Sequence, residues 1–258
     1  MKKYTLITGG ASGLGIELSK LFAKDGNNLF LISSNENNLK SAKEMLEKDY
    51  KVEVKILPLD LSNSQNFSKI KEYTDKNEMG INYLVNCAGF GDQCDFKDMD
   101  IDKQIKMVEL NCNCPMYLMR AYINEMIDNN EGHILNIASI ASFFPGPYMV
   151  SYHASKAFLL NISKGIEREL KGTKVKMTTI CPGPFASGFV AKAHNDYAFK
   201  KIKPLSSEKV AEISYKAFKK NKSLKIVGFS NKLMIFFSRF FPRKFITNTS
   251  AKTLKEDA

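Results

Sequence analysis

The 258-residue sequence has no tryptophan, only 3 histidines, and no cysteine arrangement that would build a metal site. Its 5 cysteines include no C-x-x-C pair, and no histidine lies close by in the sequence to complete a zinc site. We therefore predict no bound metal, and we interpret the thiols as reduced, small hydrophobic side chains of a cytoplasmic protein. The cysteines are Cys87, Cys94, Cys112, Cys114 and Cys181.

Long apolar runs are also missing. No stretch approaches the roughly 20 residues of a membrane-spanning helix, and the longest runs are as short as 233–237. Lys2 and Lys3 are soon followed by Thr8-Gly9-Gly10 instead of an apolar segment, which argues against a secretory signal peptide. Because 44% of the residues are hydrophobic and 25% are charged, we expect one large folded domain or a domain with an appendage.

Acidic residues are scarce in the C-terminal part of the chain. Residues 1–191 carry 22 basic and 22 acidic side chains, whereas residues 192–258 carry 16 basic and 5 acidic ones, so the net charge of +11 lies entirely in the second part. Because residues 1–191 carry no net charge, they are not expected to form a dedicated nucleic-acid-binding domain. The basic end favours a local contact with an anionic partner.

Strand-like and helix-like segments alternate along most of the chain. This alternation predicts right-handed βαβ units, and hence an α/β fold with a single doubly wound parallel sheet flanked by helices. We assign residues 1–220 to this catalytic domain and residues 221–258 to a basic amphipathic C-terminal extension. Strands are expected at 4–8, 28–33, 52–57, 81–86, 133–138 and 175–181, and helices at 13–25, 36–50, 64–79, 100–129 and 151–171.

A glycine-rich loop follows the first expected strand and begins the first helix. Gly9, Gly13 and Gly15 form the pattern G-x-x-x-G-x-G, in which small residues let the backbone approach a pyrophosphate at the positive end of a helix. The alternative is a tight turn without a ligand. The position of the loop in an α/β chain favours a Rossmann-type dinucleotide site.

The end of the second strand bears on the choice of cofactor. Ser33-Ser34-Asn35 contains neither an acid that would bind a ribose 2′-hydroxyl nor an arginine that would pair with a 2′-phosphate. Two hydroxyls and an amide can donate to phosphate oxygens, which favours NADP(H) over NAD(H). A competing interpretation is that Ser33 and Glu36 form a helix capping box.

Tyr152 and Lys156 lie four residues apart in an expected helix, so their side chains share one face. A nearby ammonium lowers the pKa of a phenol, which can then exchange a proton with an alcohol or carbonyl oxygen. Ser139 ends an expected strand, where open α/β sheets bind ligands. Asn86–Gly89 and Pro182-Gly183 end two further strands, and Asn111 lies in a helical stretch.

In these motifs the sequence resembles the short-chain dehydrogenase/reductase family over roughly residues 3–220. Residues 90–92 and 142–148 are similar to the branch of 3-ketoacyl and hydroxysteroid reductases. The resemblance covers Thr8–Gly15, Asp60-Leu61, Asn86–Gly89, Asn111, Ser139, Tyr152, Lys156 and Pro182-Gly183. The sequence departs from the common family pattern at Cys87 and Ala138, neither of which is a catalytic position.

The resemblance implies a role for each of these residues. Tyr152 would be the general acid/base, Ser139 would hydrogen-bond the substrate oxygen, and Asn111 would support a water that relays protons. Lys156 would hold the nicotinamide ribose and lower the pKa of the tyrosine. Asp60 would contact adenine, and Pro182-Gly183 would border the nicotinamide. The full set of implied cofactor-binding residues is Gly9, Ser12, Gly13, Leu14, Gly15, Ser33, Ser34, Asp60, Leu61, Asn86, Ala88, Gly89, Tyr152, Lys156, Pro182 and Gly183.

The expected function is NAD(P)(H)-dependent interconversion of a carbonyl and a secondary alcohol on an apolar, ketoacyl or steroid-like substrate. Phe143, Phe144 and Phe185 suggest the apolar character, and the segment 185–204 is expected to cover the substrate. His153 is interpreted as a surface or wall residue, not a base. Expected partners are this small molecule and further copies of the chain, in a homodimer or homotetramer. The alternative is a non-catalytic nucleotide sensor or scaffold on the same fold.

The basic extension contains an apolar helical stripe. Lys232, Arg239, Arg243 and Lys244 flank the stripe, and Pro242 ends it. A membrane interface suits this pattern, while docking on the body or on a second subunit remains open. We expect peripheral contact with an anionic membrane and no nucleic acid. The stripe consists of Leu233, Phe236, Phe237, Phe240 and Phe241.

Overall fold

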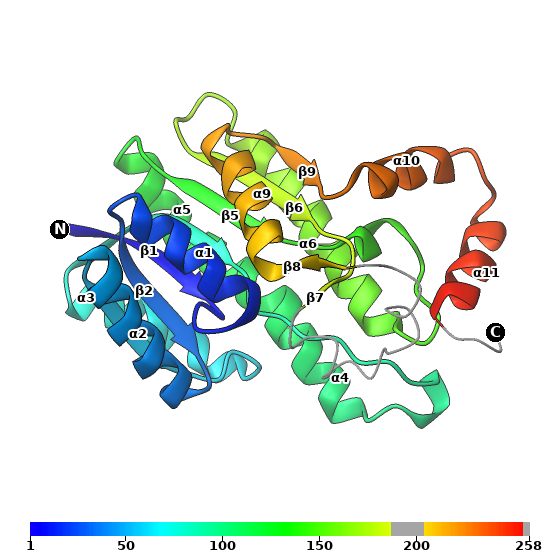
Figure 1. Cartoon of the computed structure of the whole chain (residues 1–258), viewed down its shortest axis with the longest axis horizontal. Coiled ribbons are helices and arrows are strands. Elements are labelled where there is room, and N and C mark those ends of the chain that lie inside the picture. The colour runs from blue at the N-terminus through cyan, green and yellow to red at the C-terminus, as the bar shows by residue number, and fades with distance from the viewer. Residues whose placement is uncertain (187–203, 255–258) are drawn as a thin grey trace.

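The computed structural model describes residues 1–186 and 204–254. Within them, seven parallel strands form one sheet in the order β3-β2-β1-β4-β5-β6-β9 (Figure 1). A short ladder pairs β7 with β8 beside it. The strands are β1 Lys2–Thr8, β2 Asn28–Ser33, β3 Val54–Pro58, β4 Met79–Asn86, β5 His133–Ile137, β6 Lys176–Cys181, β7 Phe185–Ala186, β8 Leu205–Ser206 and β9 Leu224–Ile226.

Helices cover both faces of the sheet, so each face has its own apolar core. Neighbouring strand residues point to opposite faces, which places Ile7 in the core under α1, α2 and α9 and Leu6 in the core under α3, α5 and α6. These strands read as continuous apolar runs because both of their faces are buried. The helices are α1 Gly13–Lys24, α2 Glu36–Tyr50, α3 Phe67–Lys76, α4 Ile101–Val108, α5 Cys114–Asp128, α6 Val150–Glu169, α9 Ser207–Lys219, α10 Phe229–Ser238 and α11 Arg243–Leu254.

The predicted α/β class and parallel sheet are confirmed, with two corrections. The single helix expected at 100–129 is interrupted by a π-helical turn at Glu109–Asn113, which separates α4 from α5. The domain boundary expected after residue 220 falls before the last strand of the sheet, because β9 pairs with β6. Within the described residues, no helix is both long enough and apolar enough to cross a membrane.

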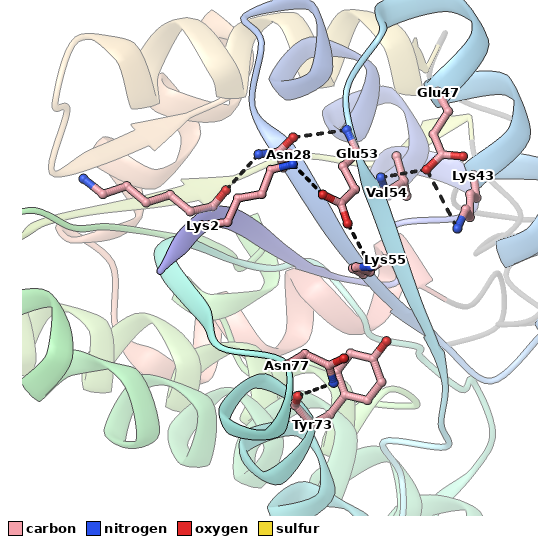
Figure 2. A network of polar contacts seen from close by, with 10 residues as sticks. Lys2, Asn28, Lys43, Glu47, Glu53, Val54, Lys55, Tyr73 and Asn77 are labelled. Carbon is pink, nitrogen blue, oxygen red and sulfur yellow. Dashed lines mark hydrogen bonds and ion pairs between the residues drawn. The ribbon is translucent and has the colours of Figure 1, made fainter.

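The free edge of the sheet at β3 carries charged and amide side chains (Figure 2). Glu47 accepts a hydrogen bond from the backbone N–H of Val54 at 3.0 Å, and Asn28 accepts one from Glu53 at 3.1 Å. Glu53 also pairs with Lys2 at 2.5 Å and Lys55 at 2.8 Å, and these cations lower its pKa to about 2. Charges on an edge strand discourage pairing with another chain.

A buried chain of amides ties the middle of the sheet to α6. The Asn86 side-chain amide at the end of β4 donates to the side-chain oxygen Oδ1 of Asn136 at 2.7 Å, and the Asn136 amide donates to the Ser163 hydroxyl at 2.8 Å. All three side chains are buried. Buried polar groups are stabilising only while they remain hydrogen-bonded, so this chain fixes β4, β5 and α6 in register.

Replacing Asn136 with alanine is expected to lower the free energy of unfolding by about 1–3 kcal/mol, because the buried Asn86 amide loses its partner. Ser163→Ala, which removes one hydroxyl at the end of the chain, should cost less. Urea denaturation followed by circular dichroism measures both. Equal stability of Asn136→Ala and the wild type would contradict this role.

Candidate active site

A cavity of about 960 Å³ opens at the carboxyl ends of the strands. This is within the size range of ligand and cofactor sites. The loops that follow β1, β2, β3, β4, β5 and β6 all contribute to its wall, and α10 and α11 close its far side. Because the strands are parallel, side chains that are distant in the sequence meet at this one edge.

The glycine loop forms one end of the cavity, and its backbone leaves no room for larger residues. Gly9 has a φ of +68°, and a Cβ there would lie 3.1 Å from the Ala88 Cα. A Cβ on Gly15 would lie 2.0 Å from the Gly9 carbonyl oxygen. Ser12 precedes α1 without a side-chain cap, and Gly13, Leu14 and Gly15 in the first turn of this helix line the cavity. This arrangement fits a bound phosphate group.

Ser33 and Ser34 line the cavity after β2, but Asn35 does not. Asn35 is the N-cap of α2 and accepts a hydrogen bond from the Asn38 N–H at 2.9 Å. The capping-box interpretation with Ser33 as the cap is therefore wrong, while the expectation that the Asn35 amide donates to a phosphate stays a prediction. Two serine hydroxyls line the cavity at this position. Next to them, Asp60 accepts bonds from the Ser62 N–H at 2.9 Å and hydroxyl at 2.7 Å.

Ser139, Tyr152 and Lys156 meet at the centre of the cavity. Ser139 follows β5, and its side chain hydrogen-bonds Tyr152 in the first turn of α6. The Lys156 ammonium lies 5.9 Å from the centroid of the Tyr152 ring, one helical turn further on. It donates to the Ile137 carbonyl at 3.0 Å.

Burial controls the protonation of this group. Removal from water raises the pKa of Tyr152 to about 12, and the hydrogen bond from Ser139 acts in the opposite direction. Burial also lowers the pKa of Lys156. Desolvation of the phenolate is thus the largest influence on the tyrosine pKa in this arrangement, and the lowering expected from Lys156 stays a prediction.

The π-helical turn brings Asn111 behind Lys156. Its amide donates to the Phe90 carbonyl and to the Ser155 hydroxyl, both at 3.0 Å, and its oxygen accepts from the Phe90 N–H at 3.2 Å. A Cβ on Gly89 would lie 2.9 Å from the Asn111 oxygen and 3.3 Å from the Lys156 nitrogen. Gly89 therefore keeps open the space between an acceptor and a cation.

Most of the residues expected at the site line the cavity, and two do not. Asn86 and Asn111 are buried behind its wall, Asn86 in the amide chain and Asn111 behind Gly89. His153 lines the wall, and its ring nitrogen lies 2.9 Å from the Phe144 carbonyl oxygen. The expected residues that do line it are Gly9, Ser12, Gly13, Leu14, Gly15, Ser33, Ser34, Asp60, Leu61, Ala88, Gly89, Ser139, Tyr152, Lys156, Pro182 and Gly183.

Sequence reasoning missed the contribution of the C-terminal helices to this cavity. Leu254 at the end of α11 packs with Met149 and Tyr152, and its carbonyl accepts a bond from the Gln93 amide at 2.7 Å. The apolar stripe in α10 was the signal, but it did not indicate what the stripe would contact. The C-terminal apolar residues in the wall are Met234, Phe237, Phe241, Phe245, Ile246 and Leu254. Of the segment 185–204 expected to cover the substrate, 187–203 lies outside the described residues, and Phe185 lines the cavity.

Two solved structures share this fold. A short-chain dehydrogenase from Sphingobium yanoikuyae, solved in complex with NADPH, aligns with a TM-score of 0.83 and 21% identity over 93% of this chain and 94% of its own. A 7β-hydroxysteroid dehydrogenase aligns with a TM-score of 0.85 and 20% identity over 96% of each chain.

Sequence comparisons identify the family. An uncharacterized oxidoreductase of Staphylococcus aureus strain USA300 is 29% identical over 202 residues, which cover 78% of this chain and 86% of that protein. Residues 3–198, most of the chain, match the family described as short chain dehydrogenase. The chain therefore belongs to the short-chain dehydrogenase family of NAD(P)-dependent oxidoreductases.

Proposed function

We propose that this enzyme interconverts a carbonyl and a secondary alcohol on an apolar substrate, with Tyr152 as the general acid/base. The observation that carries the proposal is the meeting of Ser139, Tyr152 and Lys156 in the cavity at the carboxyl edge of the sheet. A hydroxyl, a phenol and an ammonium at one point can orient a carbonyl oxygen and move a proton to it.

The residues present fit a nicotinamide dinucleotide. The glycine loop would hold its pyrophosphate, and Pro182-Gly183 would border its nicotinamide. Lys156 has three N–H donors and a hydrogen bond to Ile137, so it has donors left to hold a ribose. When bound, the cofactor would supply or accept the hydride.

The side chains of this chain would handle the proton. With a pKa raised to about 12, Tyr152 stays protonated at neutral pH and is a donor to a carbonyl oxygen. Ser139 would hold that oxygen beside the phenol. Reprotonation would pass through Lys156 and the space that Gly89 leaves beside Asn111. These roles suit carbonyl reduction, which consumes one proton for each hydride transferred.

An apolar substrate is supported by the wall of the cavity on the side of Tyr152. Phe144, Met149 and Phe185 come from the body, and Phe237 and Phe241 from α10 and the turn after it. Aromatic and aliphatic walls select apolar ligands. The steroid-like and ketoacyl classes are the candidates, and the similarity in fold to a 7β-hydroxysteroid dehydrogenase agrees with the first.

NADP(H) is the proposed cofactor. Ser33 and Ser34 can donate to a 2′-phosphate, and β2 ends without an acid that would repel one, while Asp60 after β3 is hydrogen-bonded by Ser62. The similarity in fold to an enzyme solved with NADPH agrees with this choice.

A homo-oligomer, either a dimer or a tetramer, is proposed from an apolar face on α4 and α5. Ile101, Ile105 and Val108 recur at helical spacing on α4 and are exposed, as are Met116 and Tyr117 on α5. A patch of this kind on two adjacent helices is typical of a subunit contact.

We also propose a cytoplasmic enzyme with a peripheral contact to anionic membrane. All five cysteines are free, which suits a reducing compartment. Residues 229–254 carry five basic and no acidic side chains among exposed phenylalanines, and this combination suits a charged membrane surface.

Tyr152→Phe removes only the hydroxyl, so folding and cofactor binding should be retained while kcat falls by roughly 100-fold or more. The measurement is NADPH oxidation with a panel of ketones and β-ketoacyl thioesters, together with the Kd for NADPH. Tyr73→Phe, on α3 and outside the cavity wall, is the matched control. Turnover near the wild-type value in Tyr152→Phe would contradict the assignment.

Ser34→Asp places a carboxylate beside the proposed 2′-phosphate and should shift the preference from NADPH toward NADH by roughly tenfold or more. The ratio of kcat/KM values for the two cofactors measures this shift. Asn37→Asp, exposed on α2 and outside the cavity wall, adds the same charge as a control. A wild-type ratio in favour of NADH would show that the two serines do not select the phosphate.

Ile105→Glu should convert the oligomer into a smaller species, because a carboxylate would be buried in the α4–α5 contact. Sedimentation velocity compares it with the wild type and with Ile127→Glu, which changes an exposed isoleucine at the end of α5. A wild-type monomer, or an unchanged oligomer in Ile105→Glu, would contradict the proposed interface.

A further inference from the structure

Residues 229–254, which we term the strap, form one side of the wall of the active-site cavity. Figure 1 shows α10 and α11 at one end of the molecule, away from the sheet. The strap is tied to the body at both ends. Near its start, Asn231 donates to the Val227 carbonyl at 2.8 Å, and at its end Gln93 holds the Leu254 carbonyl. Between these points Ile235 is buried.

The strap has two different apolar faces. The expected single stripe is divided, because Phe237 and Phe241 line the cavity while Leu233, Phe236 and Phe240 do not. The inner face consists of Met234, Phe237, Phe241 and Phe245. Within it, Phe241 stacks on Phe245 with ring centroids 4.9 Å apart. This face is a wall of the substrate site.

The outer face consists of Phe229, Leu233, Phe236 and Phe240, which recur at the spacing of one helical side. They are exposed, Phe229 to 79% and Phe240 to 71%. Phe236 and Phe240 pack edge to face with centroids 5.6 Å apart, so the face is a preformed aromatic surface. Contiguous aromatics of this kind mark an interaction site.

The charges beside this face identify its partner. All ionisable side chains of the strap are exposed cations. They are Lys232, Arg239, Arg243, Lys244 and Lys252. In the described part of the chain, none of them forms an ion pair. Aromatics inserted at the boundary of the headgroups, with cations around them, match an anionic bilayer.

A second copy of the chain fits this face poorly. A two-fold interface places the same patch of each subunit against itself. Here it would bring five cations against five cations with no acid between them. The α4–α5 face offers a separate apolar patch for subunit contact.

The geometry points to a route for the substrate: the strap rests on an anionic bilayer by its outer face, and an apolar ketone passes from the lipid past its inner face to Tyr152. This inference rests on the proposed reductase function and membrane contact, and it adds the source and route of the substrate. Both faces lie on the same ten-residue helix and its extension, so a molecule that leaves the lipid meets the cavity wall without crossing bulk water.

Binding is tested with the full-length protein and vesicles of phosphatidylcholine, alone or mixed with phosphatidylserine. Co-sedimentation should require phosphatidylserine, fall as salt is added, and fall roughly 100-fold or more in Phe236→Glu/Phe240→Glu. Ile127→Glu/Asn129→Glu adds the same two carboxylates at the end of α5, at the opposite edge of the sheet, and should bind as the wild type does. Equal binding by both double variants would overturn the assignment of the outer face.

The route is tested by comparing cyclohexanone, which stays in water, with cyclododecanone, which enters lipid. Phosphatidylserine vesicles should raise the rate of cyclododecanone reduction by the wild type several-fold relative to Phe236→Glu/Phe240→Glu. Both proteins should reduce cyclohexanone equally, since neither changed residue lines the cavity. Equal rates for the two proteins with vesicle-bound cyclododecanone would overturn the route.

Two further outcomes distinguish a failure of the proposed reductase function from a failure of the proposed membrane contact. If the wild type sediments with vesicles but reduces neither ketone, and no member of the wider carbonyl panel, the proposed reductase function fails while the docking surface stands. If Phe236→Glu/Phe240→Glu dissociates an oligomer that ignores vesicles, the outer face is a subunit contact and the inference is overturned.

Discussion

The Lys156 ammonium is held almost entirely out of water, and the surrounding structure depends on that constraint. The residue is 5% exposed, and its nitrogen donates to the carbonyl of Ile137 at the end of β5. A buried charge is costly unless it has partners, and burial accordingly lowers the pKa of this lysine. Gly89 and the π-helical turn at Asn111 leave space beside the nitrogen. A hydroxyl-bearing ligand that fills this space would satisfy the remaining donors.

The same burial sets the protonation of Tyr152. Without a ligand the phenol keeps its proton, because the phenolate would be poorly solvated and the Ser139 hydrogen bond offsets only part of that cost. A site in this state is prepared to donate. Oxidation of an alcohol would need Tyr152 in its deprotonated, phenolate form. That form becomes accessible as pH rises, or as bound groups bring more positive charge and hydrogen bonds to the phenolate oxygen. The protonation state of Tyr152 is thus coupled to what fills the cavity.

Local sequence patterns predicted the fold and the placement of most residues of the candidate site. They did not predict the π-helical turn, the cap of α2 or the last strand, which depend on packing. Alternating segments and strand-end motifs placed Ser139, Tyr152 and Lys156 together, since parallel strands end at one edge. The π-helical turn was missed because Asn111 continues an ordinary helical periodicity. Asn35 displaced Ser33 as the cap of α2 because it is adjacent to the first helical residue. β9 was missed because a three-residue edge strand has no readable alternation.

The apolar stripe of α10 shows most clearly why a helical period cannot assign a surface. By spacing alone one side of a helix would hold Leu233, Phe236, Phe237, Phe240 and Phe241. Of these, Phe237 near the end of α10 and Phe241 in the turn before α11 line the cavity, and the other three do not. The strap also lies beyond residues 3–198, which match the family. Ser139, Tyr152 and Lys156 therefore lie in the part of the chain that matches the family, while much of the apolar wall of the cavity comes from outside it. Leu254 of the strap packs against Tyr152, so the strap reaches the polar residues of the site as well as its apolar wall.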